Sequence, residues 1–376
     1  MTHILFLMSD TGGGHRAACR AIQAALDILY PNQFTYAMVD VWKDYYPYPF
    51  NTMPQTYSKW VNWSPTTYEA QFWVNDRIFR LRTVSSAYVR RMYRPMHRLL
   101  KEHPHDMIVC VHSVFVRPMI YTLRRDGRTT PFVTVITDYA LPTVLWYDPR
   151  VEKTLVPTEA AFQRGLRLKV PAERMVLTGA PVHPKFSQLK LTKAEARAAL
   201  DWDQDALIVL MIGGGDGMGP LVATAKAVDE KPIHAQLVII AGKNEALKRT
   251  LESRTWRHPT KVYGFVNNLE VFMRAADLLI TKAGPATMTE AALMGLPMVI
   301  SGAIRFQESP NVEYMVAQGA GVYAPGPRRV AAVVESILAN NAAQLHKLAE
   351  GVTRIAQPDA IWNIAREIYA SAPKSE

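Results

Sequence analysis

The chain has few of the features that mark secreted, disulfide-bonded or membrane-spanning proteins. Only two of its 376 residues are cysteines, and Cys19 and Cys110 both fall in predicted apolar elements, which indicates reduced core thiols. No stretch approaches the ~20 unbroken apolar residues of a spanning helix, and the chain enters an apolar strand without a basic signal segment. We therefore expect a globular protein that is cytoplasmic or bound to a membrane surface.

Two common phosphate-binding motifs are also missing, although two glycine-rich turns are present. The turns span residues 9–15, Ser-Asp-Thr-Gly-Gly-Gly-His, and residues 213–219, Gly-Gly-Gly-Asp-Gly-Met-Gly. Neither continues into Gly-Lys-Ser/Thr, and neither has G-x-G-x-x-G spacing with an acidic residue ~20 positions later. Each follows a short apolar run typical of a buried parallel strand, after which ligands of open α/β sheets bind. Ligand binding is therefore favoured over a plain strand-to-helix turn.

Alternating apolar and helical stretches predict two domains. Strands are expected near residues 4–8, 36–39, 107–111, 132–136 and 153–156, and in a second set near residues 207–212, 236–241, 261–263, 278–281 and 297–300. The proline-rich segment 179–186 has the character of a linker. We predict an α/β fold with two Rossmann-like domains facing across a cleft, residues 1–185 and 186–355. The C-terminal segment 356–376 is expected to carry a helix that packs back on the first domain.

The most specific chemistry lies where the strand near residues 278–281 runs into Lys-Ala-Gly-Pro-Ala-Thr, residues 282–287, and then into a helix. Free amides and the helix dipole at such a start bind phosphates, and Lys282 adds charge. Thr287 and Thr289 are the expected capping residues. Glu290, one turn into the helix, is placed to accept hydrogen bonds from ribose hydroxyls. A capped helix with a surface lysine and glutamate is the simpler alternative.

Positive charge predominates, with a formal net charge of +10. The stretch from Arg77 to Lys101 is rich in arginine and contains no acidic residue, and residues 42–73 just before it are rich in Trp and Tyr. Cationic helices beside aromatic residues suit a membrane interface, where anionic headgroups contribute roughly 1 kcal/mol per basic residue. A solvated basic helix over an aromatic core is the main alternative, and a nucleic-acid surface is the least favoured.

Three segments together resemble a known family: residues 9–17, residues 213–220, and the segment from Lys282 to the pair Gln307-Glu308. They look like the motifs of monogalactosyldiacylglycerol synthases and bacterial diacylglycerol glucosyltransferases, which belong to glycosyltransferase family 28. The likeness extends over most of the chain, through Thr137-Asp138 and Trp146. It implies the GT-B arrangement of two Rossmann-like domains, an inverting mechanism, a UDP-sugar donor and a membrane-lipid acceptor. The family often has a His between the Thr-Asp pair and the Trp, whereas this chain has none there.

The residues and the resemblance together give a candidate site. His15 is expected to be the catalytic base, since a helix N-terminus disfavours the imidazolium form, and Asp10 is expected to orient or polarise the site. The expected donor-binding residues are Gly214, Gly215, Asp216, Gly217, Gly264, Phe265, Val266, Lys282, Ala283, Gly284, Pro285, Ala286, Thr287, Glu290, Gln307 and Glu308. The expected acceptor and membrane contacts are Gly13, Gly14, Trp60, Trp63, Arg90, Arg91 and Arg94.

We therefore expect a UDP-sugar-dependent hexosyltransferase that moves galactose or glucose to the free hydroxyl of diacylglycerol. It would act as a peripheral protein at the cytoplasmic face of the cell membrane, with anionic lipids as partners and without nucleic acid. The scheme requires no cofactor and no metal. Asp201, Asp203 and Asp205 have D-x-D spacing, but a turn role is favoured for them.

Three alternatives remain open at this stage. They are a UDP-sugar epimerase of the same fold, a transferase acting on another lipid such as a polyprenyl-linked precursor, and a catalytically idle UDP-sugar sensor. The sequence does not decide between galactose and glucose, because the two sugars differ at one hydroxyl whose contacts depend on loop geometry.

Overall fold

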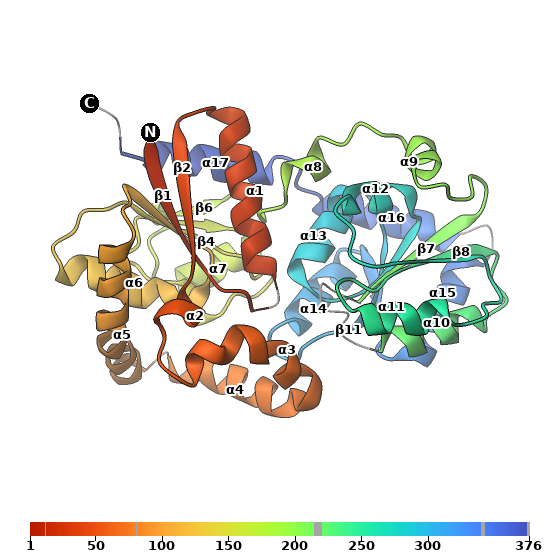
Figure 1. Cartoon of the computed structure of the whole chain (residues 1–376), viewed down its shortest axis with the longest axis horizontal. Coiled ribbons are helices and arrows are strands. Elements are labelled where there is room, and N and C mark those ends of the chain that lie inside the picture. The colour runs from red at the N-terminus through yellow and green to blue at the C-terminus, as the bar shows by residue number, and fades with distance from the viewer. Residues whose placement is uncertain (12, 80, 214–219, 340–342, 374–376) are drawn as a thin grey trace. The chain divides into compact units, whose positions relative to one another are not determined.

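The computed structural model describes residues 1–11, 13–79, 81–213, 220–339 and 343–373. The chain divides into two compact units, Met1–Pro184 with Asp359–Glu376, and Lys185–Pro358 (Figure 1). Each unit is built on one six-stranded sheet whose strand pairs are all parallel. In the part of the chain that the structure describes, no helix combines the length and apolar character needed to cross a membrane.

The sheet of the first unit has the order β2-β1-β3-β4-β5-β6. Its strands are β1 (Thr2–Met8), β2 (Phe34–Asp40), β3 (Met107–Cys110), β4 (Phe132–Val135), β5 (Lys153–Val156) and β6 (Met175–Leu177). After β2 the chain crosses back, so that β3 pairs with the other side of β1, with Leu5 opposite Ile108. Ligands of such folds bind at the carboxyl ends of the strands beside this reversal. The end of β1, where the first glycine-rich turn begins, lies at this point.

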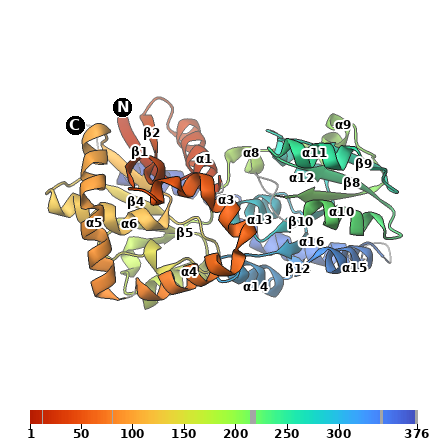
Figure 2. The ribbon, with the colours of Figure 1, turned by 60° about the horizontal axis from the view of Figure 1, so that its bottom comes forward.

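Helices cover both faces of the first sheet. One face is packed by α1 (Gly14–Leu29) and α17 (Ala360–Ser371), whose Ile364 and Ile368 join Ile22 of α1 in one buried cluster. The other face is packed by α5 (Arg82–Glu102), α6 (Ser113–Arg125) and α7 (Glu159–Arg167). Between β2 and α5 the chain forms α2 (Val41–Tyr45), η1 (Phe50–Thr52), α3 (Met53–Trp63) and α4 (Pro65–Ile78). Figure 2 shows α3 and α4 in succession before α5. The short helices η2 (Val144–Trp146) and η3 (Ala172–Arg174) lie in later loops.

The second unit repeats this plan with the order β12-β11-β10-β7-β8-β9. Its strands are β7 (Leu207–Ile212), β8 (Ala235–Ile240), β9 (Thr260–Tyr263), β10 (Leu278–Lys282), β11 (Met298–Gly302) and β12 (Gly321–Tyr323). Its helices are α8 (Pro184–Ser187), α9 (Lys193–Ala199), α10 (Leu221–Asp229), α11 (Glu245–Glu252), α12 (Leu269–Ala275), α13 (Pro285–Leu293), α14 (Ser309–Ala317), α15 (Pro327–Leu338) and α16 (Ala343–Ile355). Figure 1 shows α10 and α11 on one face of the sheet and α12 and α13 on the other. The reversal beside β7 again marks the carboxyl edge as the binding edge.

The aromatic segment before the arginine-rich stretch divides between core and surface. Tyr45, Tyr46 and Tyr68 are buried, which agrees with the aromatic-core interpretation of this segment. Tyr48 and Trp63, by contrast, are 82% and 91% exposed. A single segment thus supplies both packing and an exposed set of large apolar side chains.

Candidate functional site

The first glycine-rich turn joins the carboxyl end of β1 to the start of α1. Gly13 is the N-cap of α1 and has a φ of 75°, a left-handed conformation that favours glycine over other residues. Gly13 and Gly14 are both exposed, so the backbone is open to a ligand at this helix start. Gly12 lies outside the described residues.

His15, in the first turn of α1, is held in one orientation by its Nδ1 atom. Nδ1 lies 2.7 Å from the carbonyl oxygen of Val111 and 3.2 Å from Oγ1 of Thr137. Because a carbonyl oxygen only accepts, Nδ1 carries the proton and donates it, which leaves Nε2 with a lone pair. Burial lowers the pKa of His15 to about 4, although the hydrogen bond to Val111 and the carboxylates of Asp10 and Asp40 oppose the shift. At neutral pH the side chain is therefore a neutral imidazole that is able to accept a proton.

His112, which is not among the predicted site residues, is a neighbour of His15. The two rings lie 4.5 Å apart between centroids, and the ring of His112 stacks on Phe115 at the same distance. His112 is the N-cap of α6, where its Nδ1 accepts from the amide of Val114. Burial, followed by the charge of His15, holds the pKa of His112 well below its usual value. A histidine directly after the apolar run at residues 107–111 is the sequence signal that points to it.

Asp10 was expected to orient or polarise the site, but its carboxylate is engaged in an ion pair within the turn. Both of its oxygens accept hydrogen bonds from Arg16, each at 2.7 Å, and its backbone amide donates to Asp40 at 3.0 Å. Asp40 also caps α2 by accepting from the amide of Lys43. The Asp10 side chain therefore stabilises the turn between β1 and α1, and we assign it a role in positioning this turn.

In the second unit, α13 begins directly after β10 with Gly284 as its N-cap and Pro285 at its first position. The expectation that Thr287 or Thr289 caps this helix is wrong. The hydroxyl of Thr289 instead donates back to the carbonyls of Pro285 and Ala286, because this residue is already inside the helix. In the first turn of an α-helix the amide groups have no partner within the helix, and those of Ala286 and Thr287 fall there. The loop of Lys282, Ala283, Gly284 and Pro285 thus ends in a site suited to an anion.

Lys282 and Glu308, expected to contact different parts of the donor, are bound to each other. The Nζ atom of Lys282 lies 2.5 Å from Oε1 of Glu308, and Oε2 of Glu308 accepts from the amide of Ile304 at 3.0 Å. Glu308 is only 4% exposed, whereas Lys282 is partly exposed. The geometry therefore does not present Glu308 as an open acceptor for a sugar, and it gives the carboxylate a part in holding Lys282 beside the start of α13. Gln307, the neighbouring residue, is partly exposed.

Glu290 lies on α13 near a second ion pair. Lys185 and Glu270 are paired there at 2.7 Å, and Lys185 also donates to the carbonyl of Asn267 at 2.6 Å. Burial raises the pKa of Glu290 to about 7, with the charge of Glu270 acting in the same direction and that of Lys185 against it. Near neutral pH the carboxyl group of Glu290 is thus present in both protonation states.

The remaining predicted donor residues lie at the carboxyl edge of β9 or outside the described part of the chain. Gly264, Phe265 and Val266 follow β9 directly, and Phe265 is 57% exposed with Nζ of Lys243 5.4 Å from its ring centroid. Gly214, Gly215, Asp216 and Gly217 fall outside the described residues.

The D-x-D segment forms a turn in which Asp203 accepts from the amides of Asp205 and Ala206, a use of aspartate that is common in turns.

The predicted membrane residues are partly at the surface. Arg90, Arg91 and Arg94 are all exposed on α5, and Trp63 at the end of α3 is almost fully exposed. Trp60 is only half-buried, and its indole nitrogen donates to Thr67 at 2.8 Å. Trp63 is therefore the better placed of the two tryptophans to contact a partner.

Comparison with known proteins places this geometry in a family. Residues 15–182 match the family model described as monogalactosyldiacylglycerol (MGDG) synthase, and residues 208–360 match the glycosyltransferase family 28 C-terminal domain. A probable chloroplastic monogalactosyldiacylglycerol synthase of Glycine max is 34% identical over 97% of this chain and 71% of its own length. Chloroplastic monogalactosyldiacylglycerol synthase 3 of Arabidopsis thaliana is also 34% identical, over 97% of this chain and 80% of its own length.

Solved structures share the fold at low sequence identity. MurG of Acinetobacter baumannii superimposes with a TM-score of 0.63 at 14% identity, covering 98% of this chain and all of the other. The calicheamicin glycosyltransferase CalG4 gives a TM-score of 0.57 at 16% identity, covering 99% and 98%. The predicted GT-B arrangement of two Rossmann-like sheets is confirmed by this likeness and by the two parallel sheets.

The predicted location at the cytoplasmic face of the cell membrane is contradicted. The curated relatives are named as chloroplastic proteins, not as proteins of the cell membrane. The prediction failed for a physical reason, since basic and aromatic side chains suit any anionic membrane surface and do not specify one membrane. The sequence match to these relatives extends over 97% of the chain, and this chain therefore belongs to the monogalactosyldiacylglycerol synthase family of glycosyltransferases.

Proposed function

We propose that this protein transfers galactose from UDP-galactose to the free hydroxyl of diacylglycerol, with inversion at the anomeric carbon, at a membrane surface. The choice of substrates rests on the sequence match, over 97% of the chain, to enzymes named for the product monogalactosyldiacylglycerol. The names of these relatives also favour galactose over glucose. The geometry of the candidate residues supports the chemistry that the reaction requires.

His15 is proposed to act as the general base. Its Nδ1 proton is held by Val111, so Nε2 is the atom that accepts the proton of the glycerol hydroxyl as the oxygen attacks the anomeric carbon. UDP then leaves from the opposite face of the sugar, which inverts the anomeric centre. A base with a pKa of about 4 stays neutral and available throughout the neutral range.

The second unit is proposed to bind the nucleotide. The departing diphosphate gains negative charge, which the amides at the start of α13 and the ammonium group of Lys282 stabilise. Glu290 is proposed to accept from the ribose hydroxyls, and Gly264, Phe265 and Val266 to contact the uracil. The scheme uses no metal ion or other cofactor.

The proposal is tested by incubating the purified protein with diacylglycerol in mixed phosphatidylglycerol vesicles and either UDP-galactose or UDP-glucose. We expect release of UDP and formation of β-galactosyldiacylglycerol, with UDP-glucose as the poorer donor. The configuration at the anomeric carbon is determined by NMR of the product. Absence of glycolipid with both donors would refute the proposed function, and an α-linked product would refute inversion alone.

A UDP-sugar epimerase is the competing function at the level of the fold. The UDP-GlcNAc 2-epimerase of Neisseria meningitidis superimposes with a TM-score of 0.57 at 14% identity, over 99% of this chain and 99% of the other. Such a likeness describes the fold alone. An epimerase would convert a UDP-sugar to its isomer without lipid, so a lipid-free reaction followed by sugar analysis separates the two functions.

Replacing Lys282 with methionine is expected to weaken binding of UDP about tenfold, the effect of losing one charged hydrogen bond. The same change leaves the buried Glu308 without its cation, so the free energy of unfolding should also fall by about 1–3 kcal/mol. UDP affinity is measured by calorimetry and stability by urea unfolding.

The double substitution Lys282→Met with Glu308→Gln is the matched control for this prediction. It removes the unpaired charge and should recover most of the stability while UDP binding stays weak. If UDP affinity recovered together with stability, Lys282 would be a structural residue and its proposed contact with phosphate would be wrong.

Binding of UDP-galactose is expected to strengthen as the pH rises from about 6 to about 8, by roughly fivefold. Glu290 has a pKa of about 7, and its carboxylate form accepts hydrogen bonds from ribose hydroxyls more strongly than the neutral acid does. The diphosphate of UDP-galactose does not titrate in this range, so calorimetry at several pH values reports on the protein. Glu290→Gln should flatten the dependence; an unchanged slope in that variant would assign it to another group.

A further inference from the structure

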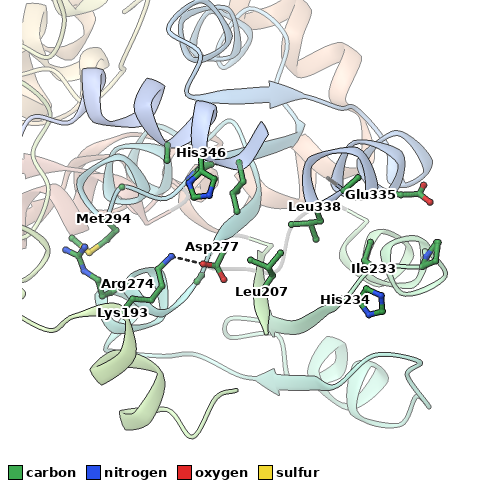
Figure 3. Close-up of a pocket in the computed structure, with 17 residues that line it drawn as sticks. Lys193, Leu207, Ile233, His234, Arg274, Asp277, Met294, Glu335, Leu338 and His346 are labelled. Carbon is green, nitrogen blue, oxygen red and sulfur yellow. Dashed lines mark hydrogen bonds and ion pairs between the residues drawn. The ribbon is translucent and has the colours of Figure 1, made fainter. Parts of the chain in front are cut away.

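The second unit carries a pocket on the edge of its sheet opposite to the proposed nucleotide loops. The pocket has a volume of about 1040 Å³, slightly above the upper end of the usual range of small-molecule sites, and Figure 3 shows the residues that line it. Leu207 is the first residue of β7, and Asp277 and Pro297 directly precede β10 and β11. The pocket therefore lies at the amino ends of the strands, whereas Lys282 and α13 follow the carboxyl end of β10.

Both carboxylates that line the pocket are already neutralised. Asp277 is bound by Lys193 at 2.6 Å and by the buried Arg197 at 2.5 Å. Glu335 is paired with Lys231 at 2.7 Å. Since two cations share the one charge of Asp277, the wall around it has a local excess of positive charge.

Arg274, near the end of α12, adds a further positive charge. Its Nε atom is buried without a hydrogen bond, and no residue in the described ranges forms an ion pair with its guanidinium group. A guanidinium offers five N–H donors in a planar fork that matches a carboxylate or phosphate. Figure 3 shows Arg274 near Lys193 and Met294, toward one end of the pocket. This end is suited to an anionic group.

The rest of the lining is mixed, with aliphatic side chains, the two histidines His234 and His346, and the paired carboxylate of Glu335. Leu207, Ile233, Leu338 and Leu345 contribute apolar side chains, and Figure 3 shows Ile233 and Leu338 toward the end away from Arg274. Among the residues that line the pocket there is no Phe, Tyr or Trp on which a nucleobase could stack. The lining thus favours an aliphatic chain over a planar ring system.

We propose that this pocket binds a single-chain amphiphilic anion, in which a carboxylate or phosphate monoester sits at one end of an aliphatic chain. Arg274 holds the anionic group with the charge of Lys193 nearby, and the chain extends toward Leu338 and Ile233. The site lies on the sheet edge opposite to the nucleotide loops, so it is separate from the proposed transferase function. A failure of either proposal leaves the other standing.

The proposal is tested by calorimetry on the whole protein with four probes: sodium octanoate, octyl phosphate, octyltrimethylammonium and inorganic phosphate. We expect saturable binding of one equivalent of octanoate or octyl phosphate, and binding of octyltrimethylammonium and inorganic phosphate at least about tenfold weaker. The ratio of the affinities for octanoate and octyl phosphate distinguishes a carboxylate ligand from a phosphate ligand. Equal binding of the cationic probe, or no saturable binding of either anion, would overturn the proposal.

Three variants locate the site. Arg274→Leu should lower the affinity for the better anion at least about tenfold, and Leu338→Glu, at the aliphatic end, should do so independently. Arg249→Leu changes an exposed arginine on α11 that does not line the pocket, and it should leave the affinity unchanged. Circular dichroism and urea unfolding verify that each variant is folded. Wild-type affinity in both folded pocket variants would refute this location.

Discussion

Replacing His15 with alanine is expected to slow galactosyl transfer by about 10²–10⁴-fold, the usual contribution of a general base. The side chain combines a fixed tautomer, set by Val111, with a pKa of about 4, so its Nε2 atom is unprotonated at neutral pH and can accept a proton. The rate is measured as UDP release and glycolipid formation under saturating donor. Binding of UDP should not change, because the nucleotide loops belong to the second unit.

The matched control is His105→Ala, which removes a histidine of the first unit from the segment before β3, at the amino end of the sheet. It should transfer galactose at the wild-type rate. Turnover that is unchanged in His15→Ala would show that His15 is not the base. Loss of turnover in both variants would indicate a general defect in folding.

Replacing Arg90, Arg91 and Arg94 together with serine is expected to weaken binding to anionic vesicles about 10²-fold, at roughly 1 kcal/mol for each basic residue. All three side chains are exposed on α5, so their removal should leave the packing of the first unit intact. The effect should be larger at low salt, because ions screen the attraction between exposed charges. Vesicle sedimentation at two salt concentrations measures it.

The control for this surface removes three exposed arginines of the second unit, Arg249, Arg328 and Arg329. The net charge changes by the same amount, so a specific role of α5 predicts a much smaller loss. Neutral phosphatidylcholine vesicles serve as a second reference. Equal losses in the two triple variants would mean that only the overall charge matters, and undiminished sedimentation of the α5 variant would refute this membrane surface.

Most strands could be predicted because they are buried on both faces and therefore continuously apolar. β1 and β7 are examples, and the expected ranges at residues 4–8 and 207–212 fall within the observed strands or coincide with them. β6 and β12 were not predicted. Each has only three residues, of which the first alone is buried, and each lies at the edge of its sheet. Such segments have no apolar run from which they can be recognised.

The candidate site was predictable only where a local motif specified it. His15 and the start of α13 follow from glycine-rich strand-to-helix turns, and both lie where the topology requires. The contact of His15 with His112 was not predictable, because it joins residues 97 positions apart through the pairing of β1 with β3. The same holds for Lys282 and Glu308, whose ion pair depends on the path of the loop after β11.

Because α17 packs on the first unit, that unit cannot finish folding until the C-terminal part of the chain has been translated. Ile361, Ile364 and Ile368 complete the cluster around Ile22, Tyr369 stacks on Tyr30 at 3.8 Å, and Glu367 pairs with Lys153. On the ribosome, one face of the first sheet therefore stays incomplete until residues beyond 358 have been synthesised. The second unit, which is continuous in sequence, has all of its residues before that point. The half of the chain that is translated first is thus the half that is finished last.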